Sequence, residues 1–116
     1  MSNFICYQKA VELYRECKKI QLKAFMKDQL LRAMSSVALN LAEGNVRNGL
    51  KDKRKFFNIA LSSLREVQCI CELEDIHRLK SSLDQLGAML YVLNRKLSDS
   101  VTEAENRQRR TKSSFQ

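Results

Sequence analysis

The sequence predicts an all-α protein, an antiparallel four-helix bundle whose helices run alternately up and down. The first observation is composition: the 116 residues include no proline and only three glycines, and 7% of them are aromatic. The second is the spacing of apolar residues, which recur at steps of three and four in four successive segments, as on one face of an α-helix. The third is the shortness of the stretches between these segments, which makes successive helices antiparallel neighbours.

The first two segments precede the Asn48-Gly49 dipeptide. The first runs from about Asn3 to Gln21, with Leu13 and Ile20 at the margins of its core face. The predicted centre of that face is Tyr7, Ala10, Val11, Tyr14 and Cys17. The second runs from about Lys27 to Arg47, and its apolar stripe steps four, three and four through Leu30, Met34, Val37 and Leu41.

The other two segments follow that dipeptide. A third helix is predicted from about Leu50 to Asp75, with a core face of Phe57, Ala60, Leu64, Val67 and Cys71. Phe56 adjoins this face, and we expect it to point into the core. The fourth helix has the most regular stripe in the chain: Leu79, Leu83, Leu86, Leu90, Leu93 and Leu97. Together the four segments predict a single bundle domain over residues 1–97.

Beyond Leu97 the apolar periodicity stops. Residues 98–116 are polar, acidic at first and basic toward the end. Such a segment cannot bury enough apolar surface to fold alone, so we expect a disordered C-terminal tail. Helix could continue through Val101–Arg107, because no residue there forbids it.

The sequence offers no membrane-spanning or export signal. No apolar run approaches the roughly 20 residues that cross a bilayer. The first six residues lack the basic start and apolar centre of a signal peptide. We therefore expect a cytoplasmic protein that does not contact a membrane.

Four cysteines raise the question of disulfides or metal. Cys6 and Cys17 lie eleven residues apart, about 16 Å along one helix, which is too far for a bond between them. Cys69 and Cys71 point in different directions on another helix. No Cys-x-x-Cys pair occurs, and His77 is the one histidine. We predict reduced, buried thiols and neither a metal nor a cofactor.

The formal net charge is +8, and the predicted topology divides the cations between the two ends of the bundle. At the first end, which we call the mixed end, Lys18, Lys19, Lys23 and Lys27 face acids such as Glu72, Glu74 and Asp75. At the other, the basic end, the cations around the second turn are expected to meet only Asp52. The basic end comprises Arg47, Lys51, Lys53, Arg54, Lys55, Arg95, Lys96, Arg107, Arg109 and Arg110.

Several cations of the basic end oppose local helix stability. Lys51, Lys53, Arg54 and Lys55 occupy the start of a helix, where the dipole disfavours a cation by about 0.3–1 kcal/mol. A cluster that conflicts with its own helix end suggests a partner that supplies negative charge, such as the phosphates of a nucleic acid. A solvated, solubilising surface is the other interpretation, since no aromatic residue is expected among these cations to stack bases.

A set of polar residues falls within or beside the apolar stripes of the second and third segments: Gln29, Arg32, Asn40, Glu43, Ser63 and Glu66. We interpret them as a structural network. Antiparallel packing would place Arg32 beside Glu66 as an ion pair, and Asn40 and Ser63 would bond across the helices. No nucleophile–base pair, Glu-x-x-His pair or glycine-rich phosphate loop occurs, so an enzyme is not expected.

Two motifs resemble a known family. Residues 29–44 read QLLRAMSSVALNLAEG and residues 59–66 read IALSSLRE. In order and spacing they resemble the four-helix-bundle proteins encoded by intervening sequences inside bacterial 23S rRNA genes, over roughly residues 3–97. The resemblance implies a link to RNA and a ring-like homopentamer. The family is also similar to the accessory bundle proteins of diversity-generating retroelements, which bind RNA and assist a reverse transcriptase. The link Ile20–Lys27 departs from the family, since it is short and has no proline.

These observations lead to one hypothesis and two alternatives. The hypothesis is a non-enzymatic homo-oligomer that binds structured RNA through its basic end, with several copies of the patch acting by avidity. The first alternative is an adaptor whose basic end binds an acidic protein. The second is an oligomer with a purely structural role.

Overall fold

The computed structural model describes residues 2–114, and the side chains of residues 4–112. Its four helices are α1 (Ser2–Lys18), α2 (Ala24–Val46), α3 (Leu50–Leu73) and α4 (Lys80–Ser114). No strand occurs in this part of the chain. The predicted all-helical fold is therefore confirmed.

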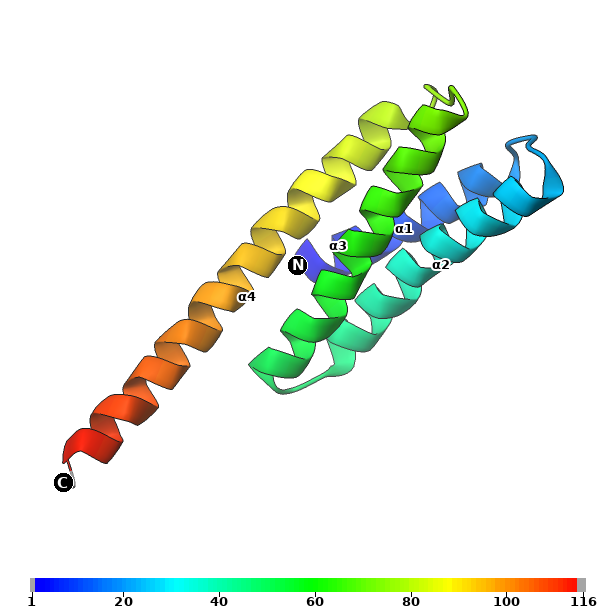
Figure 1. The fold of residues 1–116 in the computed structure, drawn as a ribbon. Coiled ribbons are helices and arrows are strands. Elements are labelled where there is room, and N and C mark those ends of the chain that lie inside the picture. Colours follow the sequence, from blue (N-terminus) through cyan, green and yellow to red (C-terminus); the bar gives the residue numbers. More distant parts are fainter. Residues whose placement is uncertain (1, 115–116) are drawn as a thin grey trace.

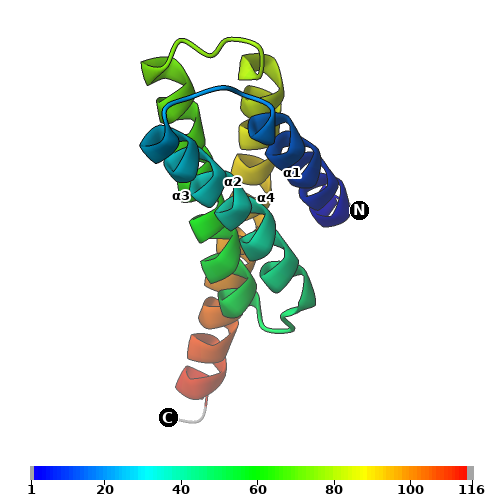
Figure 2. The same ribbon diagram turned by 90° about the vertical axis from the view of Figure 1, so that its right-hand side faces the viewer.

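The four helices form a ring of neighbours: α1 packs on α2 and α4, and α3 packs on the same two helices. Figures 1 and 2 show successive helices running in opposite directions. Hydrogen bonds between α3 and α4 fix this direction. Gln68 donates to Asp84 at 2.9 Å near one end, and Asn94 donates to the backbone oxygen of Phe57 at 3.1 Å nearer the other. As residue numbers fall along α3 they rise along α4, so the two helices are antiparallel.

The core stripes of α2, α3 and α4 are confirmed. On α2 the four predicted residues are fully buried, and on α3 all five predicted residues are buried. On α4, Leu79, Leu83, Leu86 and Leu90 are buried, and Leu93 and Leu97 are partly buried against the core. The polar residue Asn94 is also buried in this stripe, with 6% of its surface exposed.

The core face of α1 lies slightly around the helix from the predicted one. Its buried residues are Cys6, Ala10, Leu13 and Cys17. Tyr7 and Tyr14, predicted at the centre, are partly buried at the margin. This part of the prediction was wrong because cysteine packs as a small apolar residue, whereas tyrosine keeps its hydroxyl near water.

The fourth helix is longer than predicted. It runs over Lys80–Ser114, so residues 98–114 are helical rather than a disordered tail, and residues 115–116 lie outside the described part. Ion pairs one turn apart support these turns, among them Glu103 with Arg107 at 3.2 Å. The polar composition of residues 98–114 limits their contacts with the core, but it does not prevent them from forming a helix. The extension continues past the ends of the other helices, and the molecule is 63 Å long and 23 Å wide (Figure 1).

The Phe57 ring of α3 approaches the backbone of α2 closely at Gly44. Gly44 lies inside the last turns of α2 and is buried, and the Phe57 ring of α3 packs directly against it. A Cβ at Gly44 would lie 2.7 Å from Phe57 Cδ1 and closer still to a neighbouring ring carbon. Only glycine leaves room for the ring at this separation of the helices.

A lysine from the start of α3 caps the end of α2. Lys53 Nζ donates to the backbone oxygens of Gly44 at 2.8 Å and Asn45 at 3.2 Å. These carbonyls belong to the last turn of α2, where oxygens lack partners within the helix and the dipole is negative. The ammonium of Lys53 thus stabilises the end of the preceding helix.

The end of α1 has the same arrangement. Lys27, in the first turn of α2, donates to the backbone oxygens of Lys18 at 2.8 Å and of Ile20. From the loop before α4, Arg78 Nη2 donates to the backbone oxygen of Glu16 at 3.3 Å. Two helix C-termini are therefore capped by cations from segments that follow in the sequence.

We expect Gly44→Ala to lower the free energy of unfolding by up to about 2 kcal/mol. The new methyl group must displace the Phe57 ring, and overpacking of this kind costs about 1–3 kcal/mol. Helix propensity favours alanine by about 1 kcal/mol, so the net loss is smaller than the packing cost. Gly49→Ala is the control, because no described heavy atom lies within 4 Å of a Cβ there. Urea denaturation followed by circular dichroism measures both variants; equal stability would contradict the close approach.

We expect Lys53→Met to destabilise the domain by about 1–2 kcal/mol. It keeps the aliphatic stem but removes two charge-assisted hydrogen bonds from the end of α2. Lys55→Met, two residues further on and exposed, should change stability by less than about 0.5 kcal/mol. The midpoints of urea denaturation compare the two. A Lys53→Met variant as stable as Lys55→Met would show that the cap contributes nothing.

Candidate nucleic-acid interface

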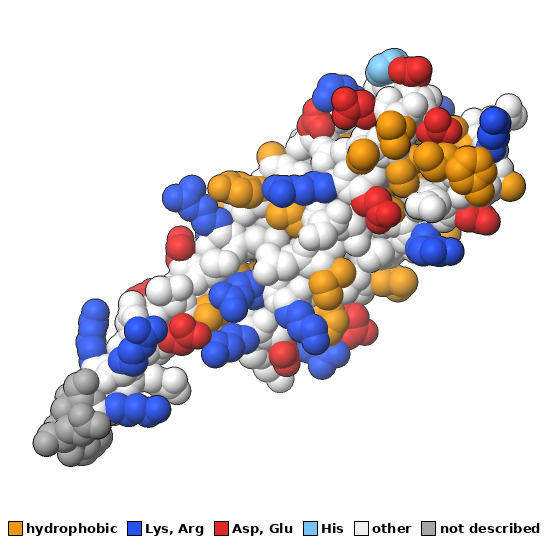
Figure 3. All heavy atoms as spheres, viewed as in Figure 1, with side chains coloured by type: hydrophobic (Ala, Val, Ile, Leu, Met, Phe, Trp, Pro, Cys, Tyr) orange, Lys and Arg blue, Asp and Glu red, His pale blue; other side chains and the backbone are white. Residues whose placement is uncertain are grey.

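The structure brings the cations of the basic end together from three elements. They come from the end of α2, the start of α3 and the part of α4 from Arg95 onward. Lys51 of α3 forms an ion pair with Glu105 of α4 at 3.1 Å, so the extension of α4 runs beside the start of α3. In Figure 3, Lys and Arg side chains gather around the start of α3 and along this extension, with Asp and Glu among them.

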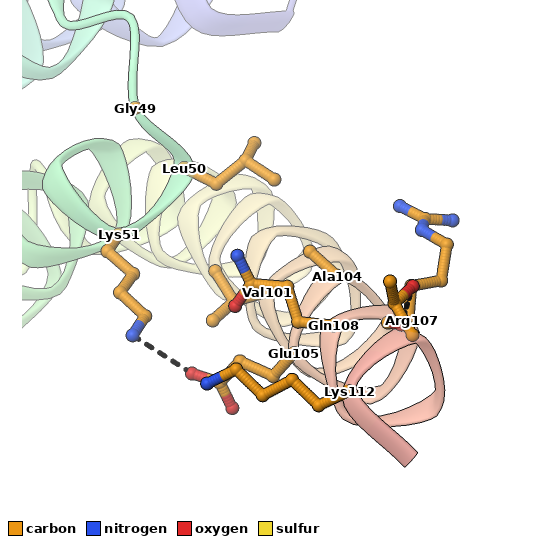
Figure 4. Close-up of a pocket in the computed structure, with 10 residues that line it drawn as sticks. Gly49, Leu50, Lys51, Val101, Ala104, Glu105, Arg107, Gln108 and Lys112 are labelled. Atoms are coloured by element: carbon orange, nitrogen blue, oxygen red, sulfur yellow. Dashed lines mark hydrogen bonds and ion pairs between the residues drawn. The ribbon is translucent and has the colours of Figure 1, made fainter. Parts of the chain in front are cut away.

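A groove of about 800 Å³ separates the start of α3 from the extension of α4 (Figure 4). Apolar side chains line part of it: Leu50, Val101 and Ala104. Gly49 and six polar side chains line the rest, one of them acidic: Lys51, Glu105, Arg107, Gln108, Thr111 and Lys112. Lys112 belongs to the predicted tail and was absent from the predicted basic end. The groove therefore combines cations with an apolar surface.

Acids compensate the basic end more than predicted. Besides the pair of Lys51 with Glu105, Glu43 pairs with Arg47 at 3.0 Å, and Arg107 pairs with Glu103. The expectation that these cations meet only Asp52 was wrong, because i,i+4 partners and the helical extension supply further carboxylates. All of these ion pairs are exposed, and exposed pairs contribute about 0–1 kcal/mol. Their cations can therefore exchange one anion for another at little cost.

The structure divides the predicted basic residues by availability. Lys53 is engaged at the end of α2, so its ammonium is not a candidate for phosphate contact, contrary to prediction. Arg54 is half-buried. The exposed members are Arg47, Lys51, Lys55, Arg95, Lys96, Arg107, Arg109 and Arg110.

An aromatic ring lies among these cations, which the sequence analysis did not expect. Phe57 is buried, as predicted. Phe56 is only half-buried, and the guanidinium carbon of Arg47 lies over its ring, 4.8 Å from the ring centre. Lys55 Nζ lies 5.8 Å from the same centre. The signal was present in the sequence, because adjacent helical residues point about 100° apart and cannot share one core position.

The predicted polar network is partly rearranged. Arg32 and Glu66 are both exposed and form no ion pair with each other, so that prediction was wrong. The register explains this. The Ser36 and Ser63 hydroxyls are hydrogen-bonded at 2.8 Å, which places Arg32 level with buried Val67. Glu66, one residue earlier, then points about 100° away.

Ser36, which was not a predicted member of the network, connects two residues that were, Asn40 and Ser63. The Asn40 amide donates to Ser36 Oγ at 3.1 Å and to the Ser36 backbone oxygen at 2.8 Å, while Ser36 bonds Ser63 across the interface. Asn40 and Ser63 are thus connected through a serine that the sequence analysis overlooked. Glu43 instead pairs with Arg47, and Gln29 is exposed.

The cysteines are free, and three of the four are buried. Burial raises the pKa of the Cys17 thiol to about 12, with a further contribution from nearby Cys71. Burial also raises the pKa values of Cys6 and Cys71. These thiols are therefore protonated and poorly nucleophilic at neutral pH. Cys69 is exposed, contrary to the prediction for all four.

Other kinds of site were sought over the same residues. No group of three or more His, Cys, Asp or Glu side chains in the described part of the chain could hold a metal ion. None of the four helices, as far as the structure describes them, combines the length and apolar character needed to cross a membrane. At the mixed end, a pocket of about 460 Å³ is lined by Gln68, Cys71, Glu72, Ile76, His77, Lys80, Leu83 and Asp84.

Comparison with known proteins places this fold. The chain is similar to a solved structure from Bacteroides thetaiotaomicron, described as a protein of unknown function from the S23 ribosomal protein family. The TM-score is 0.70 at 22% sequence identity, and the match covers 82% of this chain and 99% of that one. No curated protein matches the chain. The family model for the 23S rRNA-intervening sequence protein matches residues 2–99. With most of its length matched in this way, the chain belongs to the 23S rRNA-intervening sequence protein family.

Proposed function

We propose that this protein is a cytoplasmic, non-enzymatic homo-oligomer that binds structured RNA through its basic end. One observation carries the proposal: the start of α3 and the extension of α4 enclose a groove bordered by Lys51, Arg107 and Lys112. Further exposed cations surround this groove on all three contributing elements. The family's name, 23S rRNA-intervening sequence protein, makes RNA the first polyanion to test.

The energetics of the ion pairs are compatible with this role. Each pair in the basic end is exposed, so its separation costs little. A phosphate that replaces the carboxylate releases counterions from the RNA, which gives a favourable and salt-dependent free energy. The nearby acids then lower affinity for isolated anions and favour a polyanion that makes several contacts together.

Self-association would multiply these weak contacts. Large apolar side chains are exposed on two neighbouring helices: Phe4 (55%) and Ile5 (44%) on α1, and Tyr91 (52%) and Val92 (49%) on α4. Lys9 of α1 bonds Gln85 of α4, and the antiparallel register then sets residues 4–5 level with residues 89–90. Such a patch favours a second copy of the chain as its partner, and several linked basic ends would bind one RNA by avidity.

We expect the triple change of Lys51, Arg54 and Lys55 to Gln to weaken binding to a structured RNA strongly at low salt. It leaves Lys53 in place to cap α2, and it removes three cations from a helix start whose dipole disfavours them. The melting temperature should therefore not fall. The slope of log affinity against log salt should shrink by about one for each phosphate that the variant no longer binds.

The matched control is Lys18, Lys19 and Lys23 to Gln at the mixed end, which leaves the capping Lys27 in place. It removes the same number of cations and should weaken binding much less. Equal losses in the two triple variants would mean diffuse charge rather than a site. If the wild type binds no RNA at low salt but forms a nuclease-resistant complex with one protein, the adaptor alternative replaces this proposal.

We also expect sedimentation at micromolar concentration to show species larger than the 13.5 kDa monomer. Val92→Lys should reduce self-association, because it places a cation in the exposed apolar patch. Leu73→Lys is the control, since Leu73 is 66% exposed at the end of α3, level with the start of α4 and not with residues 91–92. A single 13.5 kDa species for the wild type would contradict the oligomer and remove the avidity argument.

A further inference from the structure

The guanidinium of Arg47 is held in place by two partners from different helices. Its carbon lies 4.8 Å from the centre of the Phe56 ring on α3, and its Nη2 pairs with the Glu43 carboxylate of α2 at 3.0 Å. The backbone of Arg47 is also fixed. Arg47 is the C-cap residue of α2, and its N–H donates to the Gly44 oxygen at 3.3 Å. An arginine at a helix end would otherwise be among the most mobile side chains of the surface.

Despite these contacts the side chain remains available, with 43% of its surface exposed. The ring lies against the guanidinium from one direction and the carboxylate contacts a nitrogen at its edge. What remains exposed is a flat, delocalised and weakly hydrated cation. Groups of this kind are used to stack nucleobases, either on the guanidinium plane itself or on an aromatic ring beside it.

The surroundings of Arg47 suit a nucleotide and not a base alone. Lys55 Nζ lies 5.8 Å from the same Phe56 ring, and Lys51 is one helical turn before Lys55 on the outer side of α3. Both ammonium groups are exposed. A base stacked on Arg47 would have its flanking phosphates near Lys55 and Lys51.

We propose that Arg47 and Phe56 form a stacking platform for an unpaired nucleobase of RNA. This inference rests on the proposed function and deepens it by naming the part of the RNA that the basic end recognises: a loop or bulge, not a paired stem. In a paired stem the bases are stacked on one another and cannot reach the platform, whereas an unpaired base can be turned out onto it.

The decisive variant is Arg47→Lys, because it keeps the charge but removes the plane. If Arg47 acts only as a cation, lysine replaces it without loss. If it acts as a stacking surface, lysine does not. Phe56→Leu tests the support beneath, since it removes the ring while leaving all the cations in place. Arg65→Lys is the matched control, since Arg65 is an exposed arginine of α3 outside the basic end, with no aromatic contact among the described side chains.

Two RNA probes separate stacking from phosphate attraction: a stem–loop with an unpaired purine loop, and a fully paired duplex containing the same stem. Wild type should bind the stem–loop more tightly than the duplex. Arg47→Lys and Phe56→Leu should each lose about tenfold in affinity for the stem–loop, as expected for one stacked base. Their affinity for the duplex should stay within about twofold of wild type, and Arg65→Lys should retain the loop preference.

A fluorescent purine analogue in the loop provides a second readout. Stacking on the platform should quench it when wild type binds, and Arg47→Lys should abolish the quenching even at saturating protein. Circular dichroism checks that Phe56→Leu remains folded, and Arg47→Lys tests the inference independently of that result. If Arg47→Lys shows the same quenching and affinity as wild type, the inference of a stacking platform is wrong, while the proposed function is unaffected. A wild type that binds neither probe would overturn both.

Discussion

The contact between the end of α2 and the start of α3 determines where the candidate functional side chains of these two helices lie. Gly44 lets the Phe57 ring approach the backbone of α2, and Lys53 ties the first turn of α3 to the last carbonyls of α2. Together these contacts hold a short turn in one geometry. Phe56 is then presented beside Arg47, and Lys51 faces the extension of α4. The part of the basic end that lies on α2 and α3 thus follows from how these two helices are joined.

This geometry changes the meaning of the positive charge at the helix starts. Counted along the sequence, a lysine in the first turn of a helix opposes that helix's own dipole. In three dimensions, Lys53 and Lys27 lie at the negative ends of the helices that precede them. Their ammonium groups lie within hydrogen-bond distance of those carbonyl oxygens, an interaction that the helix dipole favours. Net charge therefore overstates the number of cations that a polyanion could reach.

Those parts of the fold that depend on apolar periodicity were predictable from the sequence. The stripes of α2, α3 and α4 step regularly, and burial follows them closely, as with Leu30 and Leu90. The face of α1 was less predictable. Cys17 is buried as expected, but Tyr7 and Tyr14, which were also assigned to the centre of the face, are only partly buried. Apolar periodicity identifies the face that a helix can bury. It does not identify a single face on α1, because apolar residues lie on several sides of that helix.

Side-chain partners were harder to predict than helices. The pairing of Arg32 with Glu66 needed a register correct to a single residue, and antiparallel packing alone did not fix it: Arg32 lies level with Val67. The platform of Arg47 and Phe56 was missed because adjacent phenylalanines were both assigned to the core. Long-range ion pairs such as that of Lys51 with Glu105 depended on a helix that the polar composition did not predict.

The candidate interface joins two parts of the chain with different relations to the family. Arg47, Phe56 and the start of α3 lie within the residues that the family model matches, which end at residue 99. Val101, Arg107 and Lys112, which form the other side of the groove, lie beyond that match. The platform is therefore built from the family's bundle alone, whereas the groove exists because α4 continues past it. A bundle that keeps its core and helix caps can gain or lose such an extension without disturbing the turn between α2 and α3. Base stacking on the platform and phosphate attraction in the groove are thus physically separable contributions to the proposed RNA-binding surface.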